Sequence, residues 1–489
     1  MSPSTKKYTV IWIILFIFVF FQFDFNGYAK KSKNLNLKKE AFQKVDQLSE
    51  TLNDAAKKIF EFAEIHLAEY KSSKCLADLL EQNGFKIEPN AGGLPTAFVA
   101  TYGSGQPVIG ILGEFDALPG LSQKAYALNQ EPVTPNAPGH GCLHNLLGVG
   151  SAGAAIAIKT VMEQHHLKGT IKFFGCPSEE TAEGKTYMAR DGVFSGLDIC
   201  LDWHPGQINI VALGTTYASN NFEVIFHGKT AHAAADPWNG RSALDAVELM
   251  DIGVNYLREH VPVSVLMHDV IVDGGRAPNI VPDTAKVWYF VRGKNRTEVD
   301  EVYARILKIA EGASLMTETT HETHIIAGIY NFLMNKVICS AMRQNLELVN
   351  VHVFTPEEQE FARQLQRKLG KKEQGMIEKI EPFSDIEYLG GSTDSADVSW
   401  LVPTHTFCTA CMPLDIPGHH WSTVTCAASP LGYKGMQVAA KVLAGTAIDA
   451  LTDPTLIRKA QDEFKERTKG FTYKCVIPAG QKPPIVENK

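Results

Sequence analysis

The apolar residues of this chain follow two periodicities, one typical of helices and one typical of strands. At residues 37–82 they recur at three- and four-residue spacing, which predicts a mostly helical segment. Short apolar runs then predict strands at 96–102, 108–112, 170–174 and 199–201, and a Gly- and Ala-rich helix is expected at 145–166. Strands that alternate with helices predict an α/β fold with a mainly parallel sheet.

A different pattern begins near Ala218 and ends near Tyr330. It predicts strands at 222–226, 264–272, 285–291 and 320–327, with helices at 242–260 and 299–313. The order β-α-β-β-α-β is that of the split, ferredoxin-like motif. We therefore expect a lid or dimerisation domain inserted into a catalytic α/β domain.

After the insertion the pattern predicts helices at 337–348, 356–370 and 431–447, and an apolar strand within 398–412. Thr355 with Glu358 three residues later is a capping-box signature. The expected domain division is a signal peptide, two catalytic parts on either side of the inserted domain, and a loose tail: 1–29, 37–217, 218–330, 331–478 and 479–489.

The N-terminus has the features of a secretory signal. Two lysines at positions 6 and 7 precede an apolar run from Val10 to Phe21, and small residues follow up to Ala29. The run is shorter than the roughly 20 residues that a membrane helix needs. We expect cleavage after Ala29 and a secreted or periplasmic protein without a stable membrane anchor; the alternative is an uncleaved N-terminal anchor.

Composition narrows the functional classes. Of 489 residues, 45% are hydrophobic and 21% charged, which is typical of a globular protein. The formal net charge is -7 and no long basic run occurs beyond the N-terminus, which argues against a nucleic-acid partner. The 9 cysteines are scattered and odd in number, so a disulfide scaffold is not expected. Cys408 and Cys411 form a lone C-x-x-C that is interpreted as part of a buried strand.

Five residues of metal-ligand type each follow a strand, begin a helix or lie in a turn near the C-terminal end. They are Cys142, His144, one of the adjacent pair Glu179 and Glu180, His204 and His419. In an α/β sheet, residues placed in this way meet along one edge. Taken singly, each has a structural explanation: a buried thiol, a solvated acidic turn or a hydrogen-bonded histidine. Together they predict a metal site, in which the other carboxylate of the glutamate pair faces the metal-bound water.

Three other patterns carry less weight. His321 and His324 imitate a zincin fragment, but their spacing is wrong and on a strand they point to opposite faces. The glycines at 148–153 imitate a dinucleotide-binding loop, but they lie inside a predicted helix. Because no G-x-S-x-G sequence is present, a serine hydrolase is poorly supported.

Several motifs together resemble a known family. The segments are EFDALPGLSQ (114–123), GHGCLHNLLG (139–148), PSEE (177–180) and GKTAHAA (228–234). They resemble the metal-dependent amidohydrolases and peptidases related to aminoacylases and indoleacetyl-amino-acid hydrolases. GRAPNIVP (275–282) and GSTDSADVSW (391–400) further resemble the branch that contains the B-type subunits of p-aminobenzoyl-glutamate hydrolase. The resemblance covers nearly all of the chain after the signal.

The resemblance implies a site with two divalent metal ions, zinc or manganese, in which Cys142 is the bridging thiolate. The remaining ligands would be His144, Glu180, His204 and His419. Two departures affect this assignment. Leu143 replaces the glycine usual between the cysteine and the histidine, so a bulky side chain is expected to crowd the site. His420 stands where a small hydroxyl residue is common, which leaves the choice between His419 and His420 open.

The resemblance also implies catalytic roles. Glu179 would be the general base and Asp116 would orient a metal ligand. His232 would reach the active site of a partner subunit and stabilise the oxyanion. Asn279 and Arg292 would hold the substrate carboxylate.

The expected function is hydrolysis of the amide bond of an N-acyl or N-aroyl amino acid, such as p-aminobenzoyl-glutamate. The partners expected are this small-molecule substrate and a second subunit, in a homodimer or in a heterodimer with a related chain. One alternative is a dipeptidase or aminoacylase acting on other substrates. The other is a catalytically impaired binding subunit of a hetero-oligomer.

Overall fold

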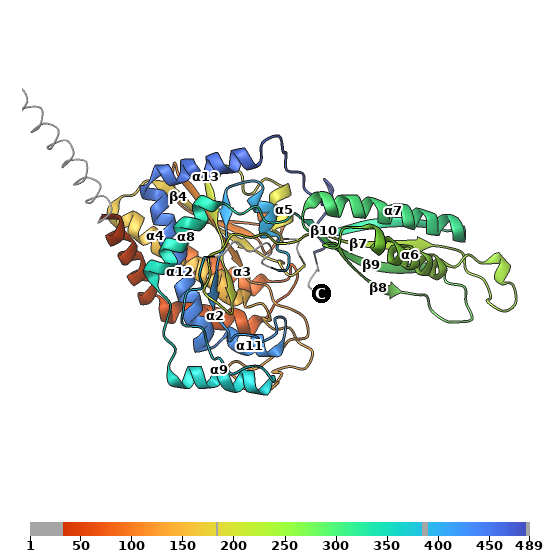
Figure 1. Cartoon of the computed structure of the whole chain (residues 1–489), viewed down its shortest axis with the longest axis horizontal. Coiled ribbons are helices and arrows are strands. Elements are labelled where there is room, and N and C mark those ends of the chain that lie inside the picture. Colours follow the sequence, from red (N-terminus) through yellow and green to blue (C-terminus); the bar gives the residue numbers. More distant parts are fainter. Residues whose placement is uncertain (1–32, 182–183, 384–389, 486–489) are drawn as a thin grey trace, which may run out of the picture.

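The computed structural model describes residues 33–181, 184–383 and 390–485. The expected signal peptide lies outside the described residues. The chain forms a larger lobe, made of segments before and after the insertion, and an elongated smaller lobe (Figure 1).

The larger lobe is built on a six-stranded sheet of mixed direction. Its order is β1 (Lys86–Pro89), β2 (Phe98–Ser104), β4 (Gly169–Cys176), β3 (Val108–Glu114), β5 (Ile199–Leu201) and β11 (Thr404–His405). The pairs β4–β3, β3–β5 and β5–β11 are parallel, whereas β1 and β2 are antiparallel to their neighbours. This confirms the expected α/β fold with a mainly parallel sheet.

Helices cover both faces of this sheet because apolar side chains alternate along β3. Ile109 and Ile111 pack against α2 (Ser49–Phe62), α3 (Tyr70–Gln82), α4 (His144–His165) and α12 (Pro430–Thr452). Leu112 points to the opposite face, toward α5 (Gly184–Arg190) and α10 (Ser395–Ser399). Gly148 lets α4 approach β3 closely, since a Cβ there would lie 2.5 Å from the Glu114 carbonyl oxygen.

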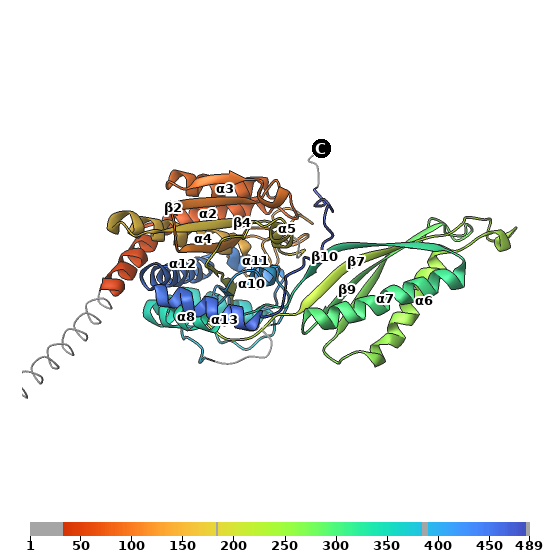
Figure 2. The same ribbon diagram turned by 90° about the horizontal axis from the view of Figure 1, so that it is seen from above.

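Helix α4 is unusually apolar. Among the described residues it is the one helix long and apolar enough to cross a membrane. However, 89% of its apolar window is buried inside the protein. It therefore has the character of a core helix, packed between the sheet and α12 (Figure 2).

The smaller lobe has the β-α-β-β-α-β order expected from the sequence. Its elements are β7 (Ala218–His227), α6 (Ala243–Leu257), β8 (Leu266–Asp273), β9 (Thr284–Gly293), α7 (Arg296–Thr317) and β10 (Thr320–Ile329). The strands pair antiparallel in the order β10-β7-β9-β8, which confirms the inserted ferredoxin-like unit. Its two helices lie on one face of the sheet (Figure 2) and share a separate apolar core with it.

The remaining elements of the larger lobe connect and cover the sheet. They are the 3-10 helix η1 (Ala91–Gly93), β6 (His204–Gly206), α8 (Lys336–Val349), α9 (Pro356–Lys368), β12 (Cys408–Ala410), α11 (Trp421–Ala427) and α13 (Pro454–Arg467). Thr355 and Glu358 form the expected capping box at the start of α9.

Three expectations need correction. The helical segment expected at 37–82 is interrupted between α2 and α3, where Ala63, His66 and Leu67 have left-handed backbone angles. The strand expected within 398–412 is instead the end of α10 followed by two short strands, β11 and β12. The tail expected to be loose from 479 is held at Lys482, whose carbonyl accepts a hydrogen bond from the Tyr187 hydroxyl, and at Gln481, which donates to Ile325 of β10.

Candidate metal centre

The ends of three parallel strands place the predicted ligands at one edge of the sheet. Strand β3 is followed by Asp116, β4 by the turn that holds Glu179 and Glu180, and β5 by His204 at the start of β6. Because carboxyl ends of parallel strands share an edge, these side chains converge. The N-terminus of α4 brings Cys142 and His144 to the same edge, and the loop before α11 brings His419.

The five predicted ligands form two overlapping groups. One is Cys142, His144 and His204, and the other is Cys142, Glu180 and His419; within each group the ligand atoms lie within 4.8 Å of one another. Cys142 Sγ lies 3.5 Å from His204 Nε2, and His419 Nε2 lies 3.5 Å from Glu180 Oε2. Tetrahedral zinc with bonds of about 2.3 Å to sulfur and about 2.0–2.1 Å to nitrogen separates such ligand atoms by roughly 3.5 Å. The geometry thus allows two cations that share one thiolate.

Hydrogen bonds orient the two histidines of the first group. His144 Nδ1 donates to Asp116 Oδ1 at 2.8 Å, and His204 Nδ1 donates to the Pro205 carbonyl at 2.8 Å. In both rings Nε2 is then the nitrogen left to bind a metal ion. Asp116 Oδ2 also accepts from the Glu180 amide at 2.9 Å, so one carboxylate connects both groups.

The loop before α11 distinguishes His419 from His420. The His419 amide donates to the Gly141 carbonyl at 3.1 Å, and its left-handed backbone (φ 50°) directs the ring toward Glu180. His420 instead accepts a hydrogen bond from the Ser422 amide through Nδ1 and caps α11. His419 is therefore the histidine that belongs with Cys142 and Glu180, and His420 is the N-cap of α11.

Leu143 does not crowd the site, contrary to the expectation from sequence. Its backbone is left-handed (φ 64°), and its side chain is fully buried in the main apolar core with Leu146 and Leu147. The conformation explains why glycine suits this position, because a left-handed non-glycine residue costs roughly 1–2 kcal/mol. Burial of the leucine side chain offsets that cost.

The electrostatics of the site fit divalent cations. Glu114 Oε2, His144 Nε2 and Glu180 Oε1 are buried and have no hydrogen-bond partner in the part of the chain that the structure describes. Burial raises the pKa of the Cys142 thiol to about 12, and the charge of Glu180 adds to this effect. Burial also raises the pKa of Glu180 to about 7. Cations bound here would stabilise the ionised forms and satisfy the three orphaned atoms.

Known proteins are similar to this chain over most of its length. The chain is 39% identical over 461 residues to the B-type subunit of p-aminobenzoyl-glutamate hydrolase from Escherichia coli (strain K12), covering 88% of this chain and 95% of that protein. It belongs to the M20 family of peptidases and amidohydrolases. The family model described as the peptidase dimerisation domain matches residues 216–315 of this M20 chain.

Other M20-related proteins match over most of the chain. The Xaa-Arg dipeptidase of Mus musculus is 28% identical over 88% of this chain and 92% of its own length. A solved dinuclear metal binding peptidase of the M20 family from Bacillus subtilis superposes with a TM-score of 0.56 at 18% identity, covering 83% and 99% of the two chains. An aminobenzoyl-glutamate utilization protein from Klebsiella pneumoniae gives 0.58 at 16% identity, with 83% and 97% coverage. At these identities the two structures support the fold.

Some residues of this M20 site were not singled out from the sequence. Lys185 is fully buried and contacts Glu114 and Asp394 beneath the site. Glu69, also fully buried, accepts hydrogen bonds from the amides of Leu67 and Ser178, both at 3.0 Å, and so holds the turn that carries Glu179. Glu114 and Asp394 lie within the recognised motifs, but a single lysine or glutamate gives no sequence signal of burial.

The three residues expected to act from the smaller lobe lie apart from the metal groups. His232 is exposed, and its Nδ1 accepts from the amides of Ala234 and Ala235 at 3.2 and 3.1 Å, which leaves Nε2–H as a donor. Asn279 is exposed beside the same loop. Arg292 stacks over Phe290 and donates to the Ser392 hydroxyl at 3.3 Å. Within one chain the described hydrogen bonds and ion pairs do not join these side chains to the metal groups.

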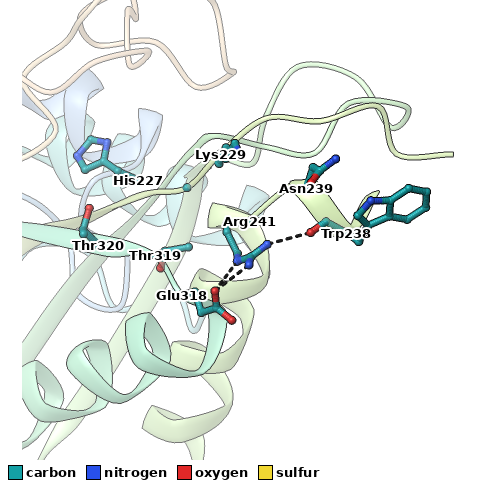
Figure 3. A pocket seen from close by; sticks show the side chains of 9 residues that line it. His227, Lys229, Trp238, Asn239, Arg241, Glu318, Thr319 and Thr320 are labelled. Atoms are coloured by element: carbon teal, nitrogen blue, oxygen red, sulfur yellow. Dashed lines mark hydrogen bonds and ion pairs between the residues drawn. The ribbon is translucent and has the colours of Figure 1, made fainter. Parts of the chain in front are cut away.

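A cavity of about 470 Å³ lies beside the loop that carries His232 (Figure 3). Arg241 bridges it, because its guanidinium pairs with Glu318 at 2.8 Å and donates to the Trp238 carbonyl at 3.1 Å. The other lining residues are His227, Gly228, Lys229, Asn239, Thr319 and Thr320. None of the predicted metal ligands lines this cavity, so it is separate from the metal centre. Its lining residues lie at the base of the loop that carries His232.

Proposed function

We propose that this M20 protein hydrolyses the amide bond of an N-acyl or N-aroyl amino acid, with p-aminobenzoyl-glutamate as the leading substrate. The observation that carries the proposal is the pair of ligand groups that share Cys142, with Glu179 beside them. The 39% identity to a p-aminobenzoyl-glutamate hydrolase subunit supports the choice of substrate.

In the proposed mechanism Cys142, His144, Glu180, His204 and His419 would hold two cations, which would supply polarisation of the amide carbonyl and activation of a water molecule. Glu179 takes the proton of that water as it attacks and delivers it to the leaving amine. Its carboxylate suits this role because burial, and then the charge of Glu114, raise its pKa well above the usual range. Asp116 keeps His144 in the metal-binding tautomer.

The smaller lobe would complete the site of a partner subunit. His232 would donate Nε2–H to the developing oxyanion. Asn279 and Arg292 would hold the substrate carboxylate. A homodimer, or a heterodimer with a related subunit, follows from this arrangement, and the matched dimerisation domain supports it.

The metal ions proposed are zinc or manganese. The thiolate of Cys142 and three nitrogen ligands favour zinc, whereas carboxylates also suit manganese. We further propose that the protein is secreted or periplasmic, on the basis of the basic and apolar N-terminal segment.

A second candidate is dipeptide hydrolysis. It is supported by the match to the Xaa-Arg dipeptidases of mouse and human, which also cover 88% of this chain. The two candidates share the metal centre and differ in the group that the pocket accepts beside the scissile amide.

The test is a substrate panel with purified chain lacking residues 1–29 and loaded with zinc or manganese. The panel contains p-aminobenzoyl-glutamate, N-acetyl amino acids and Xaa-Arg dipeptides, with Glu179→Gln as the matched control. We expect the highest kcat/KM for p-aminobenzoyl-glutamate, and a loss of kcat of at least about 10²-fold in Glu179→Gln with both metal ions retained. Preference for a dipeptide would overturn the substrate assignment, and full activity of Glu179→Gln would overturn the mechanism.

A further inference from the structure

A buried charge cluster lies directly beneath the candidate metal centre. The ammonium group of Lys185 is fully buried and lies 2.7 Å from Glu114 Oε1. It also contacts Asp394 Oδ1, and the other oxygen of Asp394 accepts from the Lys185 backbone amide at 2.7 Å. A buried ammonium paired in this way fixes the position of both carboxylates. One oxygen of Glu114 is thus held in place from below.

The second oxygen of Glu114 points to the metal-binding nitrogen of His144. Glu114 Oε2 lies 3.4 Å from His144 Nε2, and neither atom has a hydrogen-bond partner among the described residues. The Nδ1 proton of His144 is donated to Asp116, so Nε2 is the nitrogen that faces Glu114. A proton on Nε2, or a metal ion in its place, is therefore needed between these two buried atoms, and their 3.4 Å separation allows either.

The distance between these atoms is that of two ligands on one ion. With bonds of about 2.0–2.1 Å, two ligands of a tetrahedral zinc ion lie roughly 3.4 Å apart. Glu114, His144 and Glu179 also form a third group whose ligand atoms lie within 4.8 Å of one another. Glu114 is not part of the group formed by Cys142 and His204, so it approaches from the His144 side of the site.

We propose that Glu114 is a further carboxylate ligand of the cation that His144 holds, and that Lys185 with Asp394 keeps this carboxylate in position. The inference rests on the proposed two-metal site. The ligand set that the motif resemblance implies does not include Glu114.

The proposal makes the two cations unequal. The His144 and Glu114 side chains are 0% and 3% exposed, whereas the His419 side chain is 58% exposed. The deeper cation then has more protein ligands, and the cation at Glu180 and His419 keeps a position open to solvent. Sites with an open position are the ones at which water and substrate bind. The group at Glu180 and His419 is therefore the side from which water and substrate would reach the centre.

The test measures metal binding and does not depend on activity. Wild type and Glu114→Gln are dialysed against buffered free zinc, and bound zinc is counted by elemental analysis. We expect wild type to bind two ions, and Glu114→Gln to bind one of them about 10- to 100-fold more weakly. The cobalt-loaded variant should also show altered visible absorption. Asp397→Asn is the matched control, because it changes another buried carboxylate that belongs to none of the three ligand groups.

A second variant distinguishes a loss of metal binding from a folding defect. Lys185→Met combined with Asp394→Asn leaves the summed charge of the cluster unchanged and removes the support of Glu114. This double variant should bind the same zinc ion more weakly and keep a near-native circular dichroism spectrum. Unchanged zinc affinity and cobalt spectra in both variants would overturn the role of Glu114 while leaving the proposed function intact. A wild-type protein that binds no metal would instead overturn the proposed function itself.

Discussion

Asp116 Oδ1 accepts a hydrogen bond from His144 Nδ1 at 2.8 Å, at the point where β3 meets the start of α4. The same carboxylate accepts the Glu180 amide through Oδ2. Asp116 therefore orients one ligand from each of the two groups that share Cys142. Asp116 and His144 are both fully buried, so solvent cannot replace the bond between them.

Substitution of Asp116 tests this link. In Asp116→Asn an amide NH₂ group replaces one of the two carboxylate oxygens. This group cannot accept the hydrogen bond that the oxygen accepts in the wild type. Removing such a support lowers metal affinity or activity by about 10- to 100-fold in other metal sites, and we expect the same here. Zinc competition with a chromophoric chelator measures the affinity. Wild-type zinc affinity together with wild-type kcat would contradict the role given to Asp116.

Leu143→Gly tests whether the leucine serves the core or obstructs the site. Loss of a buried leucine side chain costs about 2–5 kcal/mol, and relief of the left-handed backbone returns about 1–2 kcal/mol. We therefore expect a net loss of roughly 0–4 kcal/mol in the free energy of unfolding, with unchanged zinc stoichiometry. Leu147→Gly, at a helical position of α4, has no such relief and should cost more. Tighter zinc binding by Leu143→Gly would show that the side chain obstructs the site.

The action of His232 on a partner subunit can be tested by complementation. His232→Ala and Glu179→Gln should each be inactive as purified dimers. When the two are mixed and allowed to exchange subunits, half of the dimers are mixed, and each holds one intact site. The mixture should regain about a quarter of wild-type activity. If the mixture stays inactive although light scattering and tag exchange show mixed dimers, His232 does not act across the interface.

His405 predicts a pH dependence of stability. It is fully buried in β11, and burial lowers its pKa to about 3, against about 6.5 in an unfolded chain. The unfolded state then binds one more proton below pH 6.5, so stability falls as the pH drops toward 3, by up to about 1.4 kcal/mol per pH unit. Urea unfolding of metal-free protein should show a smaller acid slope for His405→Leu than for wild type. The exposed His260→Leu is the matched control, and equal slopes in wild type and His405→Leu would contradict the prediction.

Much of the fold could be predicted because its signals are local. Strand β5 coincides with the predicted run at 199–201, and α4 begins and ends within one residue of its prediction. Both have continuous apolar patterns bounded by turns. The break between α2 and α3, which contains the left-handed residue Leu67, was missed. The Leu67 amide donates to Glu69, whose carboxylate also accepts from the Ser178 amide, remote in sequence.

The candidate site also has features that the sequence could predict and features that it could not. Placement at strand ends was enough to gather Glu180 and His204, since parallel topology decides where such residues meet, and placement at a helix start brought Cys142 to the same edge. The direction of Leu143 depends on its backbone angle, and the burial of Lys185 depends on carboxylates that are remote in sequence. Such features arise from long-range packing, which apolar periodicity does not encode.

The most direct test of a thiolate shared by two cations is anomalous diffraction at the zinc edge from crystals of the zinc-loaded protein. The account predicts two peaks roughly 3.5–4 Å apart. Cys142 Sγ should lie about 2.3 Å from both, with His144 and His204 on one ion and Glu180 and His419 on the other. A single peak, or two peaks of which neither is bonded to Cys142, would contradict it.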